Sequence, residues 1–242
     1  MAVPARNGRP GVLLLHGYTS SLDTVNGLVP TLTRLGLPYR MPVLRGHGTH
    51  QRDLRGVTAA DWHADAAAAL DDLLREVPRA AVVGLSMGGL VATQLGIERA
   101  DDLAGVALVA PFFGTKNPFA PLAGLLGRVM PYFSMPRSIY DPEVYARNTN
   151  YKQGEATSFA SAYRYSRAMR ARIGELHLPL LIVASRRDQI IPVPVIEDVV
   201  ARAGTPPDQR EVYWLERSGH DILMDMERET AYNLIGAWLA RL

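Results

Sequence analysis

The 242-residue chain contains no cysteine, few aromatic residues and no large excess of charge of either sign. Without thiols the protein has no disulfide, no thiolate–metal site and no cysteine nucleophile. Aromatic residues make up only 7% of the chain, and the 26 Lys and Arg nearly balance the 24 Asp and Glu. No block of like charges stands out, so nucleic acid is not expected as a partner.

Long hydrophobic runs are absent as well. The most apolar region, residues 103–135, is interrupted by Lys116, Arg128 and several prolines, and it never reaches the roughly 18 uninterrupted apolar residues of a membrane-spanning helix. The first nine residues are short and polar, without an apolar core of signal-peptide length. These absences predict a cytoplasmic protein with no integral membrane segment.

Apolar strand-like runs alternate with helix-like segments along most of the chain. Strands are predicted at residues 12–15, 39–44, 80–83, 106–110, 180–184 and 211–215, and helices at residues 22–35, 58–77, 90–100, 193–203 and 230–242. Because the strands are continuously apolar rather than alternating, we expect a mostly parallel sheet that is buried on both faces by helices. The length fits one α/β domain over residues 1–242.

Residues 111–174 interrupt this rhythm, and we refer to them as the cap segment. They are rich in Pro, Tyr, Phe, Met and Arg and show no strand signal, so we expect an inserted helical cap. Their apolar side chains either bury the cap on the main domain or form an acyl-binding pocket. The cluster comprises Phe112, Phe113, Phe119, Leu122, Leu125, Leu126, Met130, Tyr132, Phe133 and Met135, and the predicted substrate-binding residues are Phe112, Phe119, Leu122 and Met130.

The most informative motif is Gly84-Leu85-Ser86-Met87-Gly88, which follows a predicted strand and opens a predicted helix. In this context G-x-S-x-G predicts a nucleophile elbow, a strained turn that holds a serine hydroxyl clear of the sheet. Both flanking positions need glycine, because a side chain there would collide with the neighbouring strand or helix. The adjacent helix N-terminus favours negative charge beside the serine.

A serine nucleophile needs a base and a third group that orients the base. In open α/β sheets such groups lie at the carboxyl ends of strands. Asp188 and His220 each follow a predicted strand and give the order Ser, Asp, His, so Ser86 is the predicted nucleophile and His220 its base. Asp221 and Asp225 are weaker candidates for the acid because they follow the histidine. Asp221 either raises the histidine pKa or points to solvent.

Two backbone N–H groups are expected to bind the oxyanion of the reaction. The amide of Met87 follows the nucleophile, and the amide of Tyr18 lies in the loop after the first strand, where Gly17 lets the backbone approach the substrate. His16 and His47 are expected to shape this region rather than act as bases. No pair of histidines has metal-ligand spacing near carboxylates, so no metal is expected.

These motifs resemble those of the α/β-hydrolase superfamily, above all its small bacterial carboxylesterases and monoacylglycerol-lipase-like serine hydrolases. The resemblance implies the α/β-hydrolase fold with its cap after the sixth-strand position. It also implies hydrolysis of short- or medium-chain acyl esters or monoacylglycerols through an acyl-enzyme, without a cofactor. The matching residues span nearly the whole chain: Leu13–Tyr18, Gly46–Thr49, Asp61-Trp62, Gly84–Gly89, Asp188 with Ile191-Pro192, and Ser218–His220 with Asp225.

Three other functions fit the same motifs. A thioesterase or a carbon–carbon bond hydrolase would use the same triad, and a non-catalytic protein would reuse the fold to bind a ligand. Asp188 weighs against a pure binder, which has no need of an orienting acid. Ser86 argues against epoxide hydrolases and dehalogenases of this fold, which usually carry Asp at the elbow. Acyl-chain length, the alcohol, the oligomeric state and any movement of the cap stay open.

Overall fold

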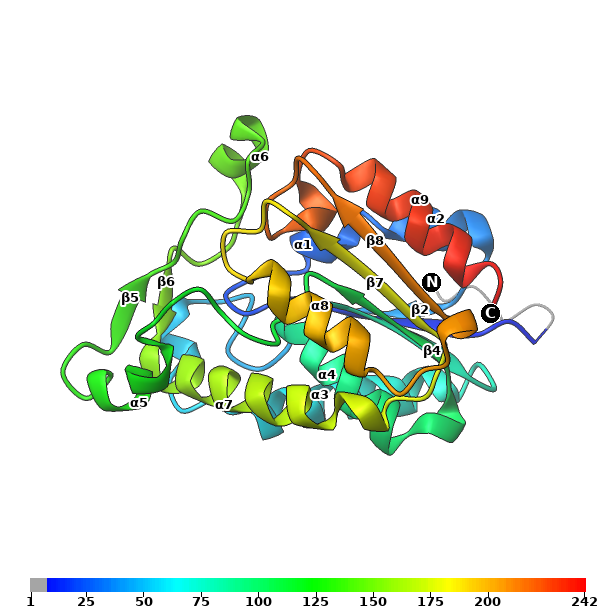
Figure 1. Ribbon diagram of the computed structural model, residues 1–242, viewed down its shortest axis with the longest axis horizontal. Coiled ribbons are helices and arrows are strands. Elements are labelled where there is room, and N and C mark those ends of the chain that lie inside the picture. The colour runs from blue at the N-terminus through cyan, green and yellow to red at the C-terminus, as the bar shows by residue number, and fades with distance from the viewer. Residues whose placement is uncertain (1–7) are drawn as a thin grey trace.

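Six parallel strands form the centre of the molecule (Figure 1). The computed structural model describes residues 8–242. The sheet has the order β2-β1-β3-β4-β7-β8, and every neighbouring pair in it is parallel. All residues of β1, β3, β4 and β7 are buried, as their continuous apolarity predicts. The strands are β1 (Gly11–Leu15), β2 (Tyr39–Arg40), β3 (Ala80–Leu85), β4 (Leu103–Val109), β7 (Leu180–Ser185) and β8 (Arg210–Leu215).

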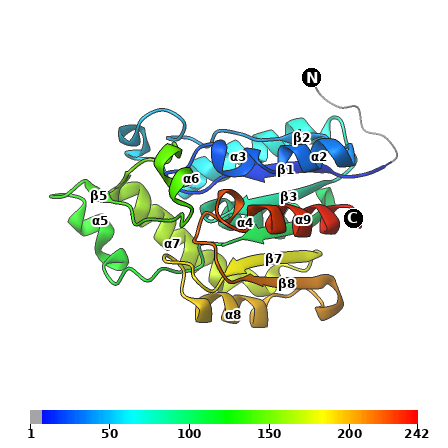
Figure 2. The same ribbon diagram turned by 90° about the horizontal axis from the view of Figure 1, so that it is seen from above.

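Helices cover both faces of this sheet (Figures 1 and 2). One face is covered by α1 (Asp23–Asn26), α2 (Val29–Leu35) and α9 (Arg228–Leu239), and the other by α3 (Ala59–Leu74), α4 (Met87–Glu98), α7 (Ala156–Arg172) and α8 (Val193–Arg202). Short 3₁₀ turns complete the chain: η1 (Gln51–Leu54), η2 (Ala100–Asp102), η3 (Ala120–Leu122), η4 (Ile173–Glu175), η5 (Pro207–Gln209) and η6 (Ile222–Met224).

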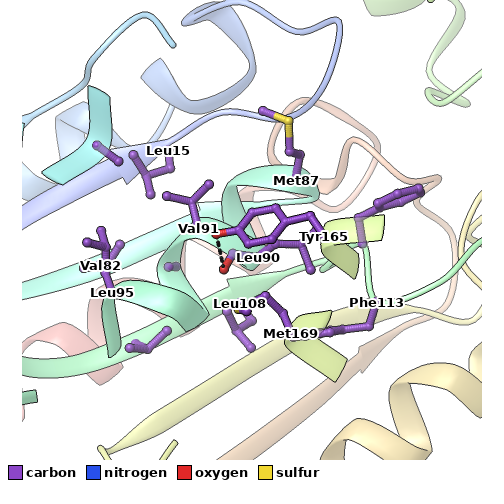
Figure 3. Packing of buried hydrophobic residues seen from close by; sticks show 14 of the residues in the cluster. Leu15, Val82, Met87, Leu90, Val91, Leu95, Leu108, Phe113, Tyr165 and Met169 are labelled. Atoms are coloured by element: carbon purple, nitrogen blue, oxygen red, sulfur yellow. Dashed lines mark hydrogen bonds between the residues drawn. The ribbon is translucent and has the colours of Figure 1, made fainter. Parts of the chain in front are cut away.

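Two apolar clusters, one on each face of the sheet, pack the strands against the helices. Successive strand residues alternate between them, so Leu13 and Leu15 belong to one cluster and Val12 and Leu14 to the other. Figure 3 shows the first cluster, in which side chains of α4 meet side chains of the sheet and of α7. The Tyr165 hydroxyl of α7 donates a hydrogen bond to a carbonyl of α4 there.

Proline shortens two of the predicted elements. The helix expected over residues 22–35 is split into α1 and α2, because Pro30 has no N–H and its ring clashes with the preceding turn of a continuous helix. The strand expected over residues 39–44 ends at Arg40, two residues before Pro42, which cannot donate to a strand ladder. The helix expected over residues 58–77 is α3, and its predicted cap is confirmed, since Thr58 and Asp61 form a capping box.

The cap segment lies beyond the carboxyl ends of the strands, between β4 and β7 in sequence (Figures 1 and 2). It contains α5 (Ala123–Leu126), α6 (Pro142–Arg147) and α7, as well as the antiparallel pair β5 (Tyr132–Ser134) and β6 (Gln153–Glu155). The prediction that it has no strand was therefore wrong. Strands of three residues are too short to show a period in the sequence, and β6 includes Gly154, which packs against the Phe133 ring. Among residues 8–242, no helix is long and apolar enough to cross a membrane.

Candidate active site

Ser86 lies in a strained turn between the end of β3 and the start of α4. Its φ of 54° and ψ of −113° are rare for a residue with a side chain. Two backbone hydrogen bonds to the end of β4 and the residues after it fix the turn. The Ser86 N–H donates to the Val109 carbonyl at 2.9 Å, and the Phe112 N–H donates to the Ser86 carbonyl at 3.1 Å. The backbone around it therefore keeps a conformation that the chain alone would avoid.

The glycines on either side of Ser86 are required by the space around them. A Cβ on Gly84 would lie 2.2 Å from the Gly88 carbonyl oxygen, and a Cβ on Gly88 would lie 2.4 Å from the Leu15 carbonyl oxygen. Both contacts involve backbone atoms, which cannot swing away as the end of a flexible side chain does. The backbones at the end of β3, the start of α4 and the end of β1 thus approach one another so closely that only glycine fits at positions 84 and 88.

We expect Gly88→Ala to lower the free energy of unfolding by about 3 kcal/mol, because the added methyl group overpacks a site walled by backbone. Urea unfolding followed by circular dichroism measures this change. The matched control is Gly174→Ala, where the nearest neighbour of a new Cβ lies at an ordinary 3.5 Å, and it should stay within about 0.5 kcal/mol of the wild type. Equal midpoints for the two variants would refute the close crossing.

The structure brings together the three side chains that the sequence analysis selected. His220 Nε2 lies 2.7 Å from Ser86 Oγ, and His220 Nδ1 lies 2.7 Å from Asp188 Oδ2. Ser86 follows β3, Asp188 follows β7 and His220 follows β8, so the carboxyl ends of the sheet supply all three. All three residues are buried. They form one hydrogen-bonded chain from hydroxyl to imidazole to carboxylate.

The Asp188 carboxylate is fixed at both oxygens. Its Oδ1 accepts hydrogen bonds from the Ile190 and Ile191 N–H groups at 2.7 and 2.9 Å, which leaves Oδ2 to face His220. Burial alone would raise the pKa of Asp188, but the positive charge and hydrogen bond of His220, with these backbone N–H groups, hold it below its usual value. Asp188 is therefore an ionised carboxylate whose Oδ2 accepts a hydrogen bond from the Nδ1–H of His220.

Two buried groups set the acid–base properties of His220. Burial alone would lower its pKa, but the negative charge and hydrogen bond of Asp188, together with the charge of Asp221, raise the pKa above the ordinary value of histidine. A histidine with a raised pKa is a stronger base toward a neighbouring hydroxyl. The arrangement can therefore accept a proton from Ser86 and hold it as imidazolium.

Asp221 is buried, which excludes the alternative that it points to solvent. Burial, with the charges of Asp188 and Asp225, raises its pKa against the lowering influence of His220 and of the Ser138 hydrogen bond. The Ser138 hydroxyl and the Asn150 side-chain amide donate to its carboxylate at 2.6 and 2.9 Å. Asp221 thus joins the histidine loop to the cap segment.

Asp225 has no role as the orienting acid, because backbone groups occupy its carboxylate. The N–H of Gly219 donates to it at 2.5 Å, and the N–H groups of Tyr140 and Asp141 in the cap segment donate at 2.9 and 2.7 Å. Glu227 in turn accepts from the N–H groups of residues 216–218. These two carboxylates hold the loop that presents His220.

Two neutral histidines shape the loop after β1. Burial lowers the pKa of His16 to about 4 and that of His47 to about 3. His16 Nε2 accepts from the Leu44 N–H and His47 Nε2 accepts from the Thr19 N–H, each at 3.1 Å, so neither ring has a nitrogen free to act as a base. Their predicted structural role is confirmed.

The same loop lies directly against the nucleophile. A Cβ on Gly17 would come within 3.2 Å of the Ser86 Cβ. The Tyr18 hydroxyl is 2.8 Å from the Glu155 carbonyl and 2.9 Å from Ser158 Oγ, so this side chain anchors the loop to the cap segment. Met87 is the first residue of α4. The oxyanion role of the Tyr18 and Met87 amides stays a prediction.

A cavity of about 560 Å³ opens over Ser86 and His220. Of the four substrate-binding residues predicted in the cap segment, Phe112 lines it. Phe119, Leu122 and Met130 do not: their side chains lie on the surface and are 64%, 48% and 66% exposed. Phe133, Met135 and Phe159 form the apolar wall instead, with Tyr18 beside them.

This correction has a physical reason in how the cap segment packs. Small residues of the α5 region face α7, since Cβ atoms on Gly124 and Gly127 would contact Ala160 and Ala156. The large side chains on either side of these glycines, which include Phe119, Leu122 and Met130, are therefore left on the outer surface. Phe159 was not among the predicted substrate-binding residues, because it lies in a helix whose many arginines indicate a solvated face. Its signal was a large aromatic residue among alanines and serines at the start of that helix.

A serine held in such a turn, and hydrogen-bonded to a histidine that contacts an aspartate, identifies the class of protein when these two residues follow later strands of the same sheet, here β8 and β7. The protein is a serine hydrolase of the α/β-hydrolase fold. Within that class the chain belongs to the family described as serine aminopeptidase, S33, whose model matches residues 7–227.

Relatives in this class are similar over nearly the full length of the chain. A thermostable monoacylglycerol lipase from Bacillus sp. (strain H-257) is 28% identical over 227 residues, which are 93% of this chain and 88% of the lipase. A carboxylesterase from Bacillus subtilis (strain 168) is 23% identical and is matched over 98% of this chain and 95% of its own.

Solved structures share the fold. A metagenome-derived lipolytic enzyme, from work on LipS and LipT, has a TM-score of 0.91 at 23% identity and covers 100% of this chain and 97% of its own. A soluble variant of monoglyceride lipase from Saccharomyces cerevisiae has a TM-score of 0.81 at 18% identity, covering 100% of this chain and 90% of its own. At these identities the likeness concerns the fold alone.

Proposed function

We propose that this protein hydrolyses carboxylic esters, with monoacylglycerols or other short- to medium-chain acyl esters as substrates. The observation that carries the proposal is the 2.7 Å contact between Ser86 Oγ and His220 Nε2 in the wall of the 560 Å³ cavity. The family and the printed activities of the two Bacillus relatives support the same reaction.

In the first step Ser86 Oγ attacks the ester carbonyl carbon while His220 Nε2 takes its proton. Asp188 holds the ring through Nδ1 and stabilises the imidazolium that forms. The carbonyl oxygen becomes an oxyanion, which we place between the backbone N–H groups of Tyr18 and Met87. The tetrahedral intermediate collapses, His220 protonates the leaving alkoxide, and an alcohol departs from an acyl-enzyme on Ser86.

In the second step water attacks the acyl-enzyme. His220 Nε2 removes a proton from the water as its oxygen bonds to the acyl carbon, and the same two amides hold the second oxyanion. The bond to Ser86 Oγ then breaks, the proton on His220 returns to Ser86, and a carboxylic acid leaves. Every proton is carried by His220, so the reaction needs no cofactor.

The two sides of the cavity suit the two parts of an ester. We place the acyl chain against Phe112, Phe133 and Phe159, and treat residues 111–174 as a cap within one domain. Asn150 and Gln189 also line the cavity, and their side-chain oxygens are buried without a hydrogen-bond partner among the described residues. Polar side chains in the lining favour an alcohol that carries hydroxyl groups, as in a monoacylglycerol.

We expect medium-chain 1-monoacylglycerols to be cleaved at least about 100-fold faster, by kcat/KM, than triacylglycerols of the same acyl chain. The reason is volume, since about 560 Å³ is ample for one acyl chain and its alcohol but falls short of three chains. Fatty-acid release from both lipids in detergent micelles measures the ratio. A p-nitrophenyl ester series of rising chain length gives the acyl preference.

Two further substrates test the alternatives. Acyl-CoA of the same chain length tests a thioesterase, and a vinylogous diketone tests a carbon–carbon bond hydrolase. Turnover of either one at more than ten times the rate of all esters, or no ester turnover above a Ser86→Ala background, would contradict the proposed function.

A further inference from the structure

Large apolar side chains gather on the surface of the cap segment at residues 119–130, which we call the apolar tip. Of the ten large hydrophobic residues that are exposed in the described part of the chain, six lie in this stretch. Single exposed apolar residues are common, but such a concentration marks an interaction surface. The six are Phe119 (64% exposed), Leu122 (48%), Leu125 (62%), Leu126 (45%), Val129 (86%) and Met130 (66%).

The packing of α5 explains why this stretch faces outward. The buried residues of the stretch 119–130 are the small Ala120, Ala123 and Gly127, and Gly124 and Gly127 bring α5 close to Ala160 and Ala156 of α7. A helix that served only to bury the cap would place its large side chains inward and its small ones outward. The apolar tip has the opposite arrangement, and α5 stands at one extreme of the molecule in both views (Figures 1 and 2).

The cap segment also carries a strong positive charge. Residues 111–174 contain nine Lys and Arg against three Asp and Glu, a net charge of +6, while the rest of the chain has 17 against 21, a net charge of −4. The overall charge of +2 therefore hides a sharply uneven distribution. Such a field attracts anionic partners to one end of the molecule.

Three of these basic residues lie beside the apolar tip. Arg128 is within it, and Arg164 and Arg167 follow Ala160 by four and seven positions, on the face of α7 that carries α5. Pro121 and Arg167 line the same surface depression, which confirms that tip and helix are adjacent. All three arginines are exposed, and within residues 8–242 none of them forms a salt bridge.

We propose that the apolar tip docks on a lipid bilayer that contains anionic phospholipid. Leu125, Val129 and their neighbours enter the interfacial layer, while Arg128, Arg164 and Arg167 contact the phosphate groups. A second copy of the chain is a poor occupant of the same surface, because two tips brought face to face would bring together two cap segments, each with a net charge of +6. The proposal goes beyond ester hydrolysis and does not depend on it.

Flotation with lipid vesicles tests the docking. The full-length protein is mixed with vesicles of phosphatidylcholine alone or with added phosphatidylglycerol. We expect binding to the anionic vesicles to be at least tenfold tighter than to the neutral ones. It should fall as salt rises from about 0.01 M to about 1 M, over which the Debye length shrinks from about 30 Å to about 3 Å.

Two pairs of variants separate the apolar and the charged contributions. Leu125→Ser with Val129→Ser removes apolar area from the tip, and its control is Val43→Ser with Met226→Ser, which are exposed outside the cap segment. Arg128→Glu with Arg164→Glu is matched in net charge by Arg9→Glu with Arg241→Glu, near the chain ends that lie opposite α5 (Figure 1). Both tip variants should lose tenfold or more in vesicle affinity, and both controls less than twofold.

Two further readouts keep the result interpretable. Turnover of a short, water-soluble p-nitrophenyl ester should be unchanged in all four variants, which shows that they are folded. Ser86→Ala should bind vesicles as the wild type does, so failure of docking and failure of the proposed hydrolysis are distinguishable. Equal binding to neutral and anionic vesicles, no binding to either, or a concentration-dependent dimer that the tip variants abolish would each overturn the proposal.

Discussion

Ser86→Ala is expected to lower kcat for ester hydrolysis by on the order of 10⁵–10⁶-fold, the range that loss of a serine nucleophile costs in a comparable protease. The variant loses the atom that bonds to the acyl carbon, and no neighbouring group can replace it at the same place. His220 Nε2 is 2.7 Å from Ser86 Oγ in the wild type, so in the variant the base His220 faces the methyl group of the alanine instead of a hydroxyl. The residual rate comes from binding and from the oxyanion site.

The measurement has a direct control in covalent labelling. A fluorophosphonate should label the wild type at Ser86 and leave Ser86→Ala unlabelled. Ser21→Ala removes a hydroxyl far from the site in the chain, whose partners are the Thr149 hydroxyl and the Asp23 N–H, and it should keep both the label and the activity. The fold of Ser86→Ala should also be intact, because the described residues give this hydroxyl its hydrogen bond to His220 alone. Full activity in Ser86→Ala would sink the assignment of the nucleophile.

Asp188→Asn is expected to lower kcat by on the order of 10⁴-fold, as the equivalent change does in chymotrypsin-like proteases. The position of the side chain should be kept, since the oxygen that binds the Ile190 and Ile191 N–H groups remains. An amide nitrogen would then face His220 Nδ1 and donate to it. That contact favours the tautomer with the proton on Nε2, which cannot accept the Ser86 proton.

The pH profile distinguishes this cause from a general loss of structure. Activity requires neutral His220 and is lost as pH falls through its pKa. Asp188 raises that pKa, so its neutral replacement should move the acid limb of kcat/KM to lower pH. Asp221→Asn should shift the limb in the same direction but lower kcat by less than about tenfold, because the Nδ1 contact is kept. If Asp221→Asn costs as much as Asp188→Asn, the role of Asp188 is wrongly assigned.

The placements that the structure bears out are those of residues tied to strand ends, while their catalytic roles stay predictions. Asp188 and His220 were found because a parallel sheet delivers its loops to one edge, so short local patterns in chain order were enough. The elbow glycines were found because the motif itself marks them, although only the demand on Gly84 is local: a Cβ on Gly84 would meet the Gly88 carbonyl, whereas a Cβ on Gly88 would meet the Leu15 carbonyl of β1. Element boundaries moved where a proline removed an N–H donor, as at Pro30 and Pro42.

The predictions that failed concern the direction in which side chains face. Phe119, Leu122 and Met130 have the composition of a pocket, but which side of a short helix meets the protein depends on the helix beneath it. Composition likewise could not reveal β5 and β6. These strands of three residues each exist because they pair with one another by backbone hydrogen bonds within the cap segment.

By itself, then, the amino-acid sequence determined the class of sheet, the chain order of the three residues that meet at its edge and the small net charge of +2. Those properties follow from local periodicity, turn sterics and composition. The tertiary structure alone decided that Asp221 and Asp225 join the histidine loop to the cap segment, that Phe159 lines the cavity, and that an apolar surface with basic neighbours faces outward. Those properties depend on contacts between residues far apart in the chain, and packing settles them only once the sheet and its helices are in place.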